Sequence, residues 1–390
     1  MKILFIGEYS GAYKTLIKFM KSKNIEIFWL HDGDGYKNIQ GADYSIKFKK
    51  IKSKYKVIAF ILKFYYLFLE IMGIKGFLQI RKYNEFIETL KDYDVVQLVN
   101  TKPLGEYSSL ANIYFLKKIF KNNKKVYLSA LGDDYTWVNE CLRGGFRYSI
   151  FDRINYKNFF LYSWPLLYVY GLGYRKLNNY VIDNVQAIIP GLYDYYIAYK
   201  NNNIKKLTKI VPIAIEKRID KPLCENKIEF PIKIFHGWQK NKDLRKGNDI
   251  FDEAIKSLQL KYPKKIEYII VSNVSYDEYL EKFNSSHIFI DQCFSMDMGV
   301  NGLLGLSSGK VVFTGFESEV KMYYGVNNEK IAINALPDVD RVFNDLENFI
   351  IKPSLINEYS LGALNFIENY HSPEYVLKEF LSIWQNDLEV

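Results

Sequence analysis

The sequence predicts an α/β protein with two doubly wound parallel sheets, and three observations lead to this fold class. Short apolar runs alternate with segments whose apolar residues recur at helical spacing, as in parallel strands joined by helices. The alternation occurs in two series, separated by a polar segment that contains two prolines. The chain has 390 residues, 48% hydrophobic and 25% charged, which is enough for two globular domains with cores of their own.

The first series begins at the N-terminus. Lys2–Gly7 is an apolar run that ends in glycine, which is typical of a buried parallel strand. After a helical segment, the expected elements are strands at 25–35, 94–100, 124–134 and 205–216, a helix at 108–122, and a strand followed by a helix in 185–200. These elements predict an N-terminal Rossmann-like domain over residues 1–215.

The second series follows a predicted linker, residues 216–231, which reads EKRIDKPLCENKIEFP. The expected elements are strands at 232–238, 265–274 and 287–292, helices at 247–263 and 275–286, and a helix and a strand in 301–315. They predict a C-terminal Rossmann-like domain over residues 232–365. Helical patterns continue to the end of the chain, so we expect residues 366–390 to form a helical tail that could pack back on the N-terminal domain.

Charge is distributed unevenly along the chain. Residues 1–210 carry 33 Lys and Arg against 17 Asp and Glu, a net charge of +16, whereas residues 211–390 carry 20 against 27, a net charge of −7. A basic half suits an anionic surface or substrate. Nucleic acid is the less suitable partner, because the basic residues are interleaved with long apolar runs. We therefore expect no nucleic acid to bind.

The basic residues are densest in KFKKIKSKYK, Lys47–Lys56, which an apolar, aromatic segment follows directly. This order is typical of an interfacial membrane contact, and a solvated lysine face followed by a core helix is the alternative. The apolar segment, Val57–Leu78, contains Lys63, Glu70 and Lys75, so it is poorly suited to span a bilayer. A peripheral contact with an anionic membrane is the expectation.

Cysteine and N-terminal patterns bear on the compartment. The three cysteines, Cys141, Cys224 and Cys293, are far apart in the chain and form neither a disulfide framework nor a zinc-binding spacing. The N-terminus has no signal-peptide pattern. These features predict a cytoplasmic protein without a metal site.

Candidate site residues follow from the rule that ligands of open α/β sheets bind beyond the carboxyl ends of the strands. In the second series, a strand ends at His236-Gly237. The loop before the next helix contains four basic residues: Lys240, Lys242, Arg245 and Lys246. A basic loop before a helix start is suited to a diphosphate, and a solvated basic loop is the alternative.

A second loop lies in IFIDQCFSMDMGVNGLLGLSSGKVVFTG, Ile288–Gly315. The strand ends at Asp291-Gln292, and a helix is expected to begin near Asn301-Gly302-Leu303. Free backbone N–H groups at a helix start bind phosphate without a side chain. Alternatively, the small residues simply let the helix pack on the sheet.

In the first series, Gly7 and Gly11 lie in the loop after the first strand, and Asp133 and Asp134 follow the strand at 124–134. The aspartates could orient a sugar or an acceptor. The alternative is a helix N-cap beside a surface acid.

Four segments together resemble a known family: HGWQKNKDLRKG, FIDQ followed by GVNGLLGLSSGKVVFTG, LSALGDDYTW, and NYHSPEYVLKEFLSIW. Their order and spacing are similar to those of retaining GT-B-fold glycosyltransferases of the glycosyltransferase 4 type, over nearly the whole chain. The resemblance implies two Rossmann-like domains that face each other across a cleft, the N-terminal one on the acceptor side and the C-terminal one on the nucleotide-sugar side.

The resemblance also implies an activity. A sugar passes from a nucleotide sugar to a saccharide acceptor with retained configuration, and neither a metal nor a cofactor beyond the donor takes part. The implied acceptor is linked to a lipid diphosphate, as in surface-polysaccharide or lipopolysaccharide O-antigen synthesis at the inner face of the cell membrane. The implied catalytic residues are Asp133, Asp134, Arg245 and Lys246, and the donor-binding residues are Gly7, Gly11, His236, Gly237, Asp291, Gln292, Asn301, Gly302 and Leu303.

The chain departs from the family pattern at three places. Trp238 stands where the family commonly has arginine, Leu131 lies near the position of a family histidine, and the paired glutamates are missing. Their expected positions fall near Met296 and Leu304, with Asp297 as the nearest carboxylate. Two alternatives therefore stay open: a GT-B-fold nucleotide-sugar epimerase, and a catalytically silent protein that binds sugar nucleotides.

Overall fold

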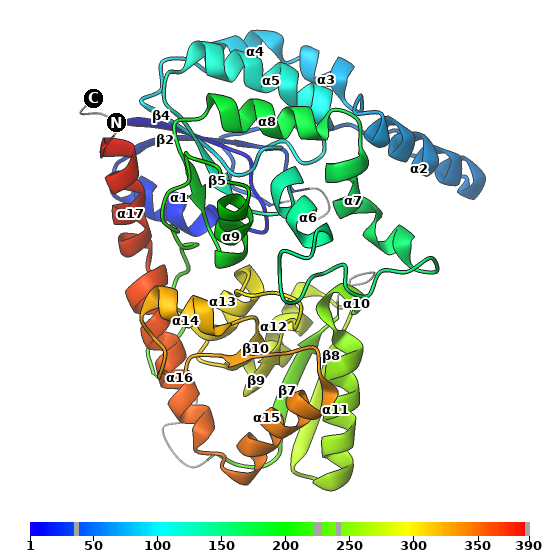
Figure 1. Cartoon of the computed structure of the whole chain (residues 1–390), viewed down its shortest axis with the longest axis vertical. Helices are drawn as coiled ribbons and strands as arrows, with labels where there is room; N and C mark the ends of the chain where they lie inside the picture. The colour runs from blue at the N-terminus through cyan, green and yellow to red at the C-terminus, as the bar shows by residue number, and fades with distance from the viewer. Residues whose placement is uncertain (35–38, 222–227, 239–242, 387–390) are drawn as a thin grey trace. The chain divides into compact units, whose positions relative to one another are not determined.

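The structure is a computed structural model, and it describes residues 1–34, 39–221, 228–238 and 243–386. The chain forms two compact units (Figure 1). Unit 1 comprises Met1–Gly145, Tyr162–Ile213 and the chain from Leu377 onward, and unit 2 comprises Phe146–Leu161 and Ala214–Val376. The chain therefore passes between the units more than once, and each unit is described by itself below.

Unit 1 contains a six-stranded parallel sheet in the order β3-β2-β1-β4-β5-β6. Its strands are β1 (Lys2–Ile6), β2 (Glu26–His31), β3 (Tyr44–Ser45), β4 (Val95–Leu98), β5 (Val126–Ala130) and β6 (Ile188–Pro190). The strand order reverses between β1 and β4, which is where a doubly wound sheet offers a ligand site at the carboxyl ends of its strands.

The helices of the first two hundred residues are α1 (Lys14–Ser22), α2 (Lys56–Ile71), α3 (Phe77–Arg81), α4 (Asn84–Thr89), α5 (Ser109–Asn122), α6 (Tyr135–Leu142), α7 (Ser163–Tyr170), α8 (Tyr174–Asn184) and α9 (Tyr193–Asn201), with the 3-10 turn η2 (Phe159–Tyr162) before α7. Helix α1 buries Leu16, Ile17 and Met20, which recur at helical spacing, against the sheet. Strands β1, β4 and β5, in the middle of the sheet, are buried on both faces, as parallel strands are.

Unit 2 contains a five-stranded parallel sheet in the order β11-β10-β9-β7-β8. Its strands are β7 (Ile232–Gly237), β8 (Ile266–Val271), β9 (Ile288–Ile290), β10 (Val311–Thr314) and β11 (Ile333–Asn334). The order reverses between β7 and β9, so the second reversal point lies there.

The helices from unit 2 to the C-terminus are α10 (Asp243–Lys246), α11 (Asn248–Lys261), α12 (Tyr276–Asn284), α13 (Val300–Ser307), α14 (Ser318–Tyr324), α15 (Val339–Ile351), α16 (Leu355–Phe366) and α17 (Pro373–Asn386), with the π-helical turn η3 (Ile367–His371) before α17. The core of unit 2 packs β7, β9 and β10 against α11 and α15 through Ile234, Phe251, Phe313 and Leu346.

The last helix completes the core of unit 1. Trp384, near the end of α17, is fully buried, and its indole N–H donates to Gln97 Oε1 at 3.0 Å. Its ring packs edge-on against Phe5 of β1. Helix α17 therefore contributes Trp384 to this unit's hydrophobic core.

The segment Phe146–Leu161 docks on unit 2 through paired charges. Arg147 donates to Glu317 at 2.6 Å and to Glu319 at 2.8 Å, at the start of α14. Arg153 makes a bidentate pair with Asp249, in the first turn of α11, at 2.6 and 2.7 Å. Bidentate pairs of this kind fix orientation as well as position.

The two parallel sheets predicted from the sequence are confirmed, but the strand expected at 205–216 is wrong. The segment runs beside β6 with hydrogen bonds from Ile188 N to Lys206 O, from Thr208 N to Ile188 O and from Val211 N to Pro190 O, and only one isolated bridge is formed. Pro212 has no N–H to continue a ladder. Of the predicted linker 216–231, residues 222–227 lie outside the described part.

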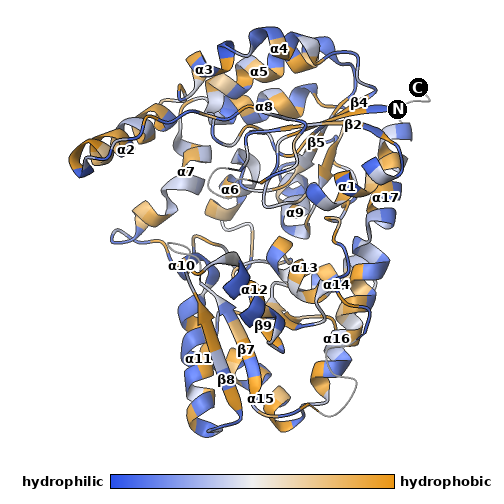
Figure 2. Ribbon diagram, turned by 180° about the vertical axis from the view of Figure 1, so that it is seen from behind, coloured by the Kyte–Doolittle hydropathy of each residue, from blue (hydrophilic) through white to orange (hydrophobic). Residues whose placement is uncertain are grey.

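Helix α2 is apolar, yet most of its side chains are exposed to solvent. Figure 2 shows it as a largely apolar helix that projects from the rest of unit 1. Glu70 is its one fully buried side chain. Within the described ranges, no helix is long and apolar enough to cross a membrane.

Candidate functional site

Three segments of unit 2 meet where its strand order reverses. Lys246, at the end of α10, places Nζ 2.8 Å from Asp291 Oδ1, directly after β9. Thr314, at the end of β10, donates its hydroxyl to Asp291 Oδ2 at 3.2 Å. The Asp291 side chain is 2% exposed and that of Lys246 14%. The carboxylate is thus held by a cation on one side and a hydroxyl on the other.

Close backbone packing brings these segments together. Gly247 has φ +76°, and a Cβ there would lie 2.2 Å from Cys293 Sγ. Only glycine fits both the left-handed conformation and this contact. Cys293 N donates to Lys246 O at 3.1 Å, which adds a backbone link between the turn before α11 and the loop after β9.

The first turn of α13 lies above Asp291. A Cβ on Gly302 would come within 3.2 Å of Thr314 Oγ1 and 3.4 Å of Asp291 Oδ2, so the helix start and the carboxylate are in contact. The predicted donor residues Asp291 and Gly302 are therefore brought together with Lys246. Backbone N–H groups in the first turn of a helix have no partner within that helix, and those of Val300, Asn301 and Gly302 occupy these positions.

Leu303 does not fit its predicted role as a backbone donor. Its N–H donates to Gly299 O at 3.1 Å, so it is already part of the helical hydrogen-bond ladder. Its side chain is fully buried in the core. The interpretation that small residues allow α13 to pack on the sheet also holds, because a Cβ on Gly305 would lie 2.7 Å from Phe289 and from Val312.

The remaining predicted residues of unit 2 differ from one another in burial and in hydrogen-bond partners. His236 is fully buried, with Nδ1 2.7 Å from the Tyr268 hydroxyl, and burial lowers the pKa of His236 to about 3. It is therefore neutral at physiological pH and belongs to the core. Gly237 and Arg245 are half-buried. Gln292 donates to Ser295 Oγ at 2.9 Å. Lys240 and Lys242 of the basic loop lie outside the described residues.

In unit 1, loops after three strands converge on Tyr9. Its hydroxyl donates to Lys102 O at 2.6 Å, after β4, and its ring lies where a Cβ on Gly132, after β5, would come within 2.9 Å. Gly7, in the loop after β1, has φ +90°, and a Cβ there would lie 2.4 Å from Val99 Cγ1. Gly11 has φ +85° and faces open space. Gly7 thus closes the turn, whereas Gly11 leaves room beside it.

The predicted aspartates of unit 1 have separate roles. Asp134 is fully buried and caps α6: Oδ1 accepts from Trp137 N at 2.8 Å and Oδ2 from the Tyr199 hydroxyl at 2.6 Å. Burial raises the pKa of Asp134 to about 6. Both oxygens serve the fold, which favours the N-cap interpretation. Asp133 beside it is half-exposed and is the member of the pair that can reach a ligand.

Two further acids at this edge were not among the predicted site residues. Glu8 directly follows the turn at Gly7, is fully buried and accepts from Tyr13 N at 3.1 Å, and burial raises its pKa to about 8. Asp32 follows β2 and accepts from Glu106 N at 2.6 Å, and burial raises its pKa to about 6. Their positions at strand ends could have marked Glu8 and Asp32 as candidate site residues, but the sequence does not show that they are buried.

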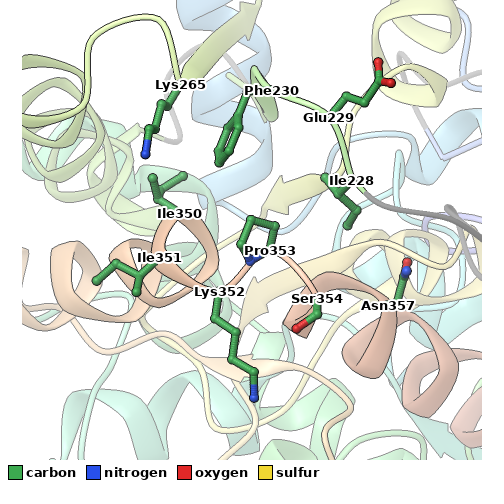
Figure 3. Close-up of a pocket in the computed structure, with 10 residues that line it drawn as sticks. All are labelled: Ile228, Glu229, Phe230, Lys265, Ile350, Ile351, Lys352, Pro353, Ser354 and Asn357. Atoms are coloured by element: carbon green, nitrogen blue, oxygen red, sulfur yellow. The ribbon is translucent and has the colours of Figure 1, made fainter.

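A hollow of about 850 Å³ lies at the other edge of the unit 2 sheet (Figure 3). It is lined by Ile228, Glu229, Phe230, Lys265, Ile350, Ile351, Lys352, Pro353, Ser354 and Asn357. Phe230 and Lys265 precede β7 and β8, so the hollow faces the amino ends of these strands. Ligands of open α/β sheets bind at the carboxyl ends, and we do not place the site here. Among the described residues, no group of three or more His, Cys, Asp or Glu is arranged to hold a metal ion.

No protein-family model matches this chain, and no curated protein sequence does. Solved structures do match over the whole length. Anabaena HepE in complex with UDP and glucose has a TM-score of 0.58 at 10% identity and covers 99% of both chains. Sucrose-phosphate synthase from Thermosynechococcus elongatus has a TM-score of 0.58 at 10% identity and covers 100% of both chains.

This chain has a GT-B fold. A third GT-B-like match, a proposed UDP-N-acetylglucosamine 2-epimerase from Listeria monocytogenes, has a TM-score of 0.51 at 9% identity and covers 99% of this chain and 96% of the other. At such identities the similarity establishes the GT-B fold alone. The chemistry must then be argued from the residues at the carboxyl edges of the two sheets.

Proposed function

We propose that this GT-B protein is a glycosyltransferase that moves a sugar from a nucleotide sugar to a saccharide acceptor with retained configuration. The observation that carries the proposal is the cluster of Lys246, Asp291 and the first turn of α13 at the reversal point of the unit 2 sheet. A cation and free helix-start amides at this position suit a diphosphate. The similar HepE structure, which holds UDP and glucose, supports the same donor class.

The leaving group would be stabilised by fixed charges and dipoles. As the bond between sugar and diphosphate breaks, negative charge grows on the diphosphate. The amides of Val300, Asn301 and Gly302 would meet this charge, together with the cationic side chains of Arg245 and Lys246. Asp291, whose other oxygen accepts from Thr314, holds the Lys246 side chain in position before the donor binds, so little reorganisation is needed during the reaction.

Unit 1 would supply the acceptor side. Asp133 is a half-exposed carboxylate at its carboxyl edge and would orient the attacking hydroxyl or the transferred sugar. We further propose that the acceptor is a saccharide on a lipid diphosphate, as used in surface-polysaccharide or lipopolysaccharide O-antigen synthesis, at the inner face of the cell membrane. The net charge of +16 on residues 1–210 supports an anionic surface as the location.

A nucleotide-sugar 2-epimerase is the second candidate. Similarity to the Listeria protein supports it, as do the buried acids Glu8 and Asp32, whose raised pKa values suit proton transfer near neutral pH. The products distinguish the two activities. An epimerase alters the sugar nucleotide with no acceptor present, a transferase releases the nucleoside diphosphate, and a silent binding protein does neither.

The first experiment is a thermal-shift screen against UDP-, GDP- and dTDP-linked sugars, because a ligand of the native state raises apparent stability. Nucleoside diphosphate release is then measured with the sugar nucleotide that binds. We expect Arg245→Ala to reduce turnover by roughly 10²-fold in a protein that still folds. Arg341→Ala, which removes an exposed arginine of α15, is the control. If Arg245→Ala and Lys246→Ala both turn over like the parent, the donor-site assignment is wrong.

A further inference from the structure

Helix α2 exposes apolar side chains over about half of its circumference. Val57, Phe60, Ile61, Phe64 and Phe68 are 55–72% exposed. The opposite side carries Leu62, Tyr66 and Leu69, which are also apolar or aromatic and only half-buried. Apart from the exposed Lys56 and Lys63 and the buried Glu70, the residues of α2 are therefore apolar or aromatic all round, and such a helix is normally buried in a core or a membrane. This one is buried at neither face within unit 1, so we infer that a partner covers it.

The charges beside α2 identify the partner. All six lysines of Lys47–Lys56 are exposed and lead directly into the helix, and Lys50 pairs with Glu106. A second copy of this chain would bring the same lysines to the contact and be repelled. The partner must cover apolar side chains and attract lysines. An anionic membrane leaflet does both, because its hydrocarbon interior is apolar and its headgroups are negatively charged.

Aromatic side chains next to α2 fit the same partner. Trp164 and Tyr170 of α7 and the following Leu172 are exposed, and Leu172 N donates to Ile71 O at 2.8 Å. Leu172 therefore adjoins the C-terminal end of α2, and helix α7, which carries the other two side chains, also contacts α2. Trp and Tyr are enriched where membrane proteins pass from hydrocarbon to headgroups, because their rings are apolar with a polar edge.

The base of α2 is fixed to the carboxyl edge of the sheet. Glu70 is buried and pairs with Lys75 and, at 3.1 Å, with Lys102, and it also accepts from the Tyr174 hydroxyl. Lys102 follows β4, next to the reversal point of the unit 1 sheet. The helix is therefore joined to the loop where the acceptor is proposed to bind.

We propose that α2 and the preceding lysines dock unit 1 on an anionic membrane, with the helix lying in the interface. Its 16 residues span about 24 Å, which is shorter than the hydrocarbon core of a bilayer. Through Glu70 and Lys102, docking brings the acceptor edge of unit 1 to the headgroups. This last step rests on the proposed lipid-linked acceptor, whereas the docking itself does not.

Flotation of the full chain with vesicles tests the docking, with no sugar nucleotide present. Phosphatidylcholine vesicles with and without phosphatidylglycerol are compared at low and at high salt. We expect binding to the anionic vesicles that weakens with salt. Phe60→Glu/Phe64→Glu should lower the partition coefficient at least about tenfold, because each change places a charge on the lipid-facing side. Leu260→Glu/Met322→Glu, at 86% and 60% exposed residues of α11 and α14, is the control with the same change in charge.

A lysine triple tests the electrostatic part. Lys49→Gln/Lys52→Gln/Lys54→Gln should weaken anionic binding by roughly fivefold per residue and flatten its salt dependence. Lys117→Gln/Lys121→Gln/Lys124→Gln removes the same charge from another exposed part of unit 1 and should bind like the parent. All these positions are exposed, so melting temperatures should not change, and this is measured for each variant.

Three outcomes would overturn the inference. One is the absence of binding to anionic vesicles at low salt, and another is equal binding by the α2 variants and their controls. The third is a dimer, seen by light scattering, that Phe60→Glu/Phe64→Glu dissociates while vesicle binding is unaffected. A protein that transfers sugar but does not float refutes the docking alone, and one that floats but never turns over refutes the proposed function alone.

Discussion

Replacing Lys246 by methionine removes its charge and keeps most of its stem, and it leaves the Asp291 carboxylate buried without its cation. The two groups are 2.8 Å apart, and the Asp291 side chain is 2% exposed. Removing one partner of a buried pair costs about 3–5 kcal/mol, because the other charge is left uncompensated. Each kcal/mol lowers the melting temperature of a unit this size by about 2–4 °C, so the unit 2 transition should fall by about 6–20 °C.

A double-variant cycle separates this structural role from catalysis. Asp291→Asn alone should also be destabilised, because Lys246 then lacks its counter-charge. In Lys246→Met/Asp291→Asn both charges are gone, and the double variant should be more stable than the sum of the single losses predicts by about 0.5–3 kcal/mol. If Lys246 also stabilises the leaving diphosphate, turnover in the double variant should stay roughly 10²–10³-fold below that of the parent.

The cycle is measured by calorimetry and by nucleoside diphosphate release from the sugar nucleotide that the thermal-shift screen selects. Lys282→Met, at an exposed pair on α12, is the control for loss of a lysine charge. Single variants that melt like the parent would show that the ion pair does not exist in the native protein. A double variant that recovers both stability and turnover would show that Lys246 merely neutralises Asp291, and the donor-site argument would fail.

Two further predictions concern the fold around the site. Burial lowers the pKa of His236 to about 3, whereas its value in the unfolded chain is about 6.5. Between these two pH values the unfolded state binds more protons than the folded state, so the free energy of unfolding falls as the pH drops toward 3. The loss should be about 2 kcal/mol at about pH 5. His236→Gln should flatten this part of the denaturation profile, and an unchanged slope would contradict the assignment. Gly247→Ala should cost about 1–3 kcal/mol more than Gly144→Ala, because both glycines have φ near +75° but only at Gly247 would a Cβ meet another atom, Cys293 Sγ at 2.2 Å. Equal losses in chemical denaturation would rule out the close contact.

The strands could be predicted from the sequence wherever burial and pairing coincide. Lys2–Gly7 and Ile288-Phe289-Ile290 are apolar because both faces of a parallel sheet are covered, and both form strands. The segment 205–216 is apolar because it is buried, not because it pairs as a strand. Ile210, Val211 and Ile213 are buried, yet no regular ladder forms beside β6. Apolar runs report burial, and backbone pairing follows only where the chain direction and its N–H groups permit it.

The candidate site shows the same limit in its side chains. The strand-end rule placed Lys246, Asp291 and Gly302 at the carboxyl edge of one sheet, and in the structure the three residues lie together. It could not show that Lys246 is bound to Asp291, or that both oxygens of Asp134 are used as a helix cap and by Tyr199. The helix cap is local and was one of the two interpretations open from the sequence. The contacts of Lys246 with Asp291 and of Tyr199 with Asp134 join residues tens of positions apart, and their geometry depends on packing that no local pattern specifies.

Helix α2 reverses the usual distribution of side chains, and this reversal contradicts the interpretation of its sequence as a core helix. Phe60, Phe64 and Phe68 face solvent, while Glu70, the one acidic residue of the helix, is buried with Lys75 and Lys102. A core helix would show the opposite arrangement, so the core interpretation does not hold for the described structure. Exposed phenyl rings raise the free energy of the protein in water in proportion to their area, and covering them lowers it again. The lysines of Lys47–Lys56 cannot cover these rings, but they can draw the helix to an anionic membrane, whose hydrocarbon interior can cover them.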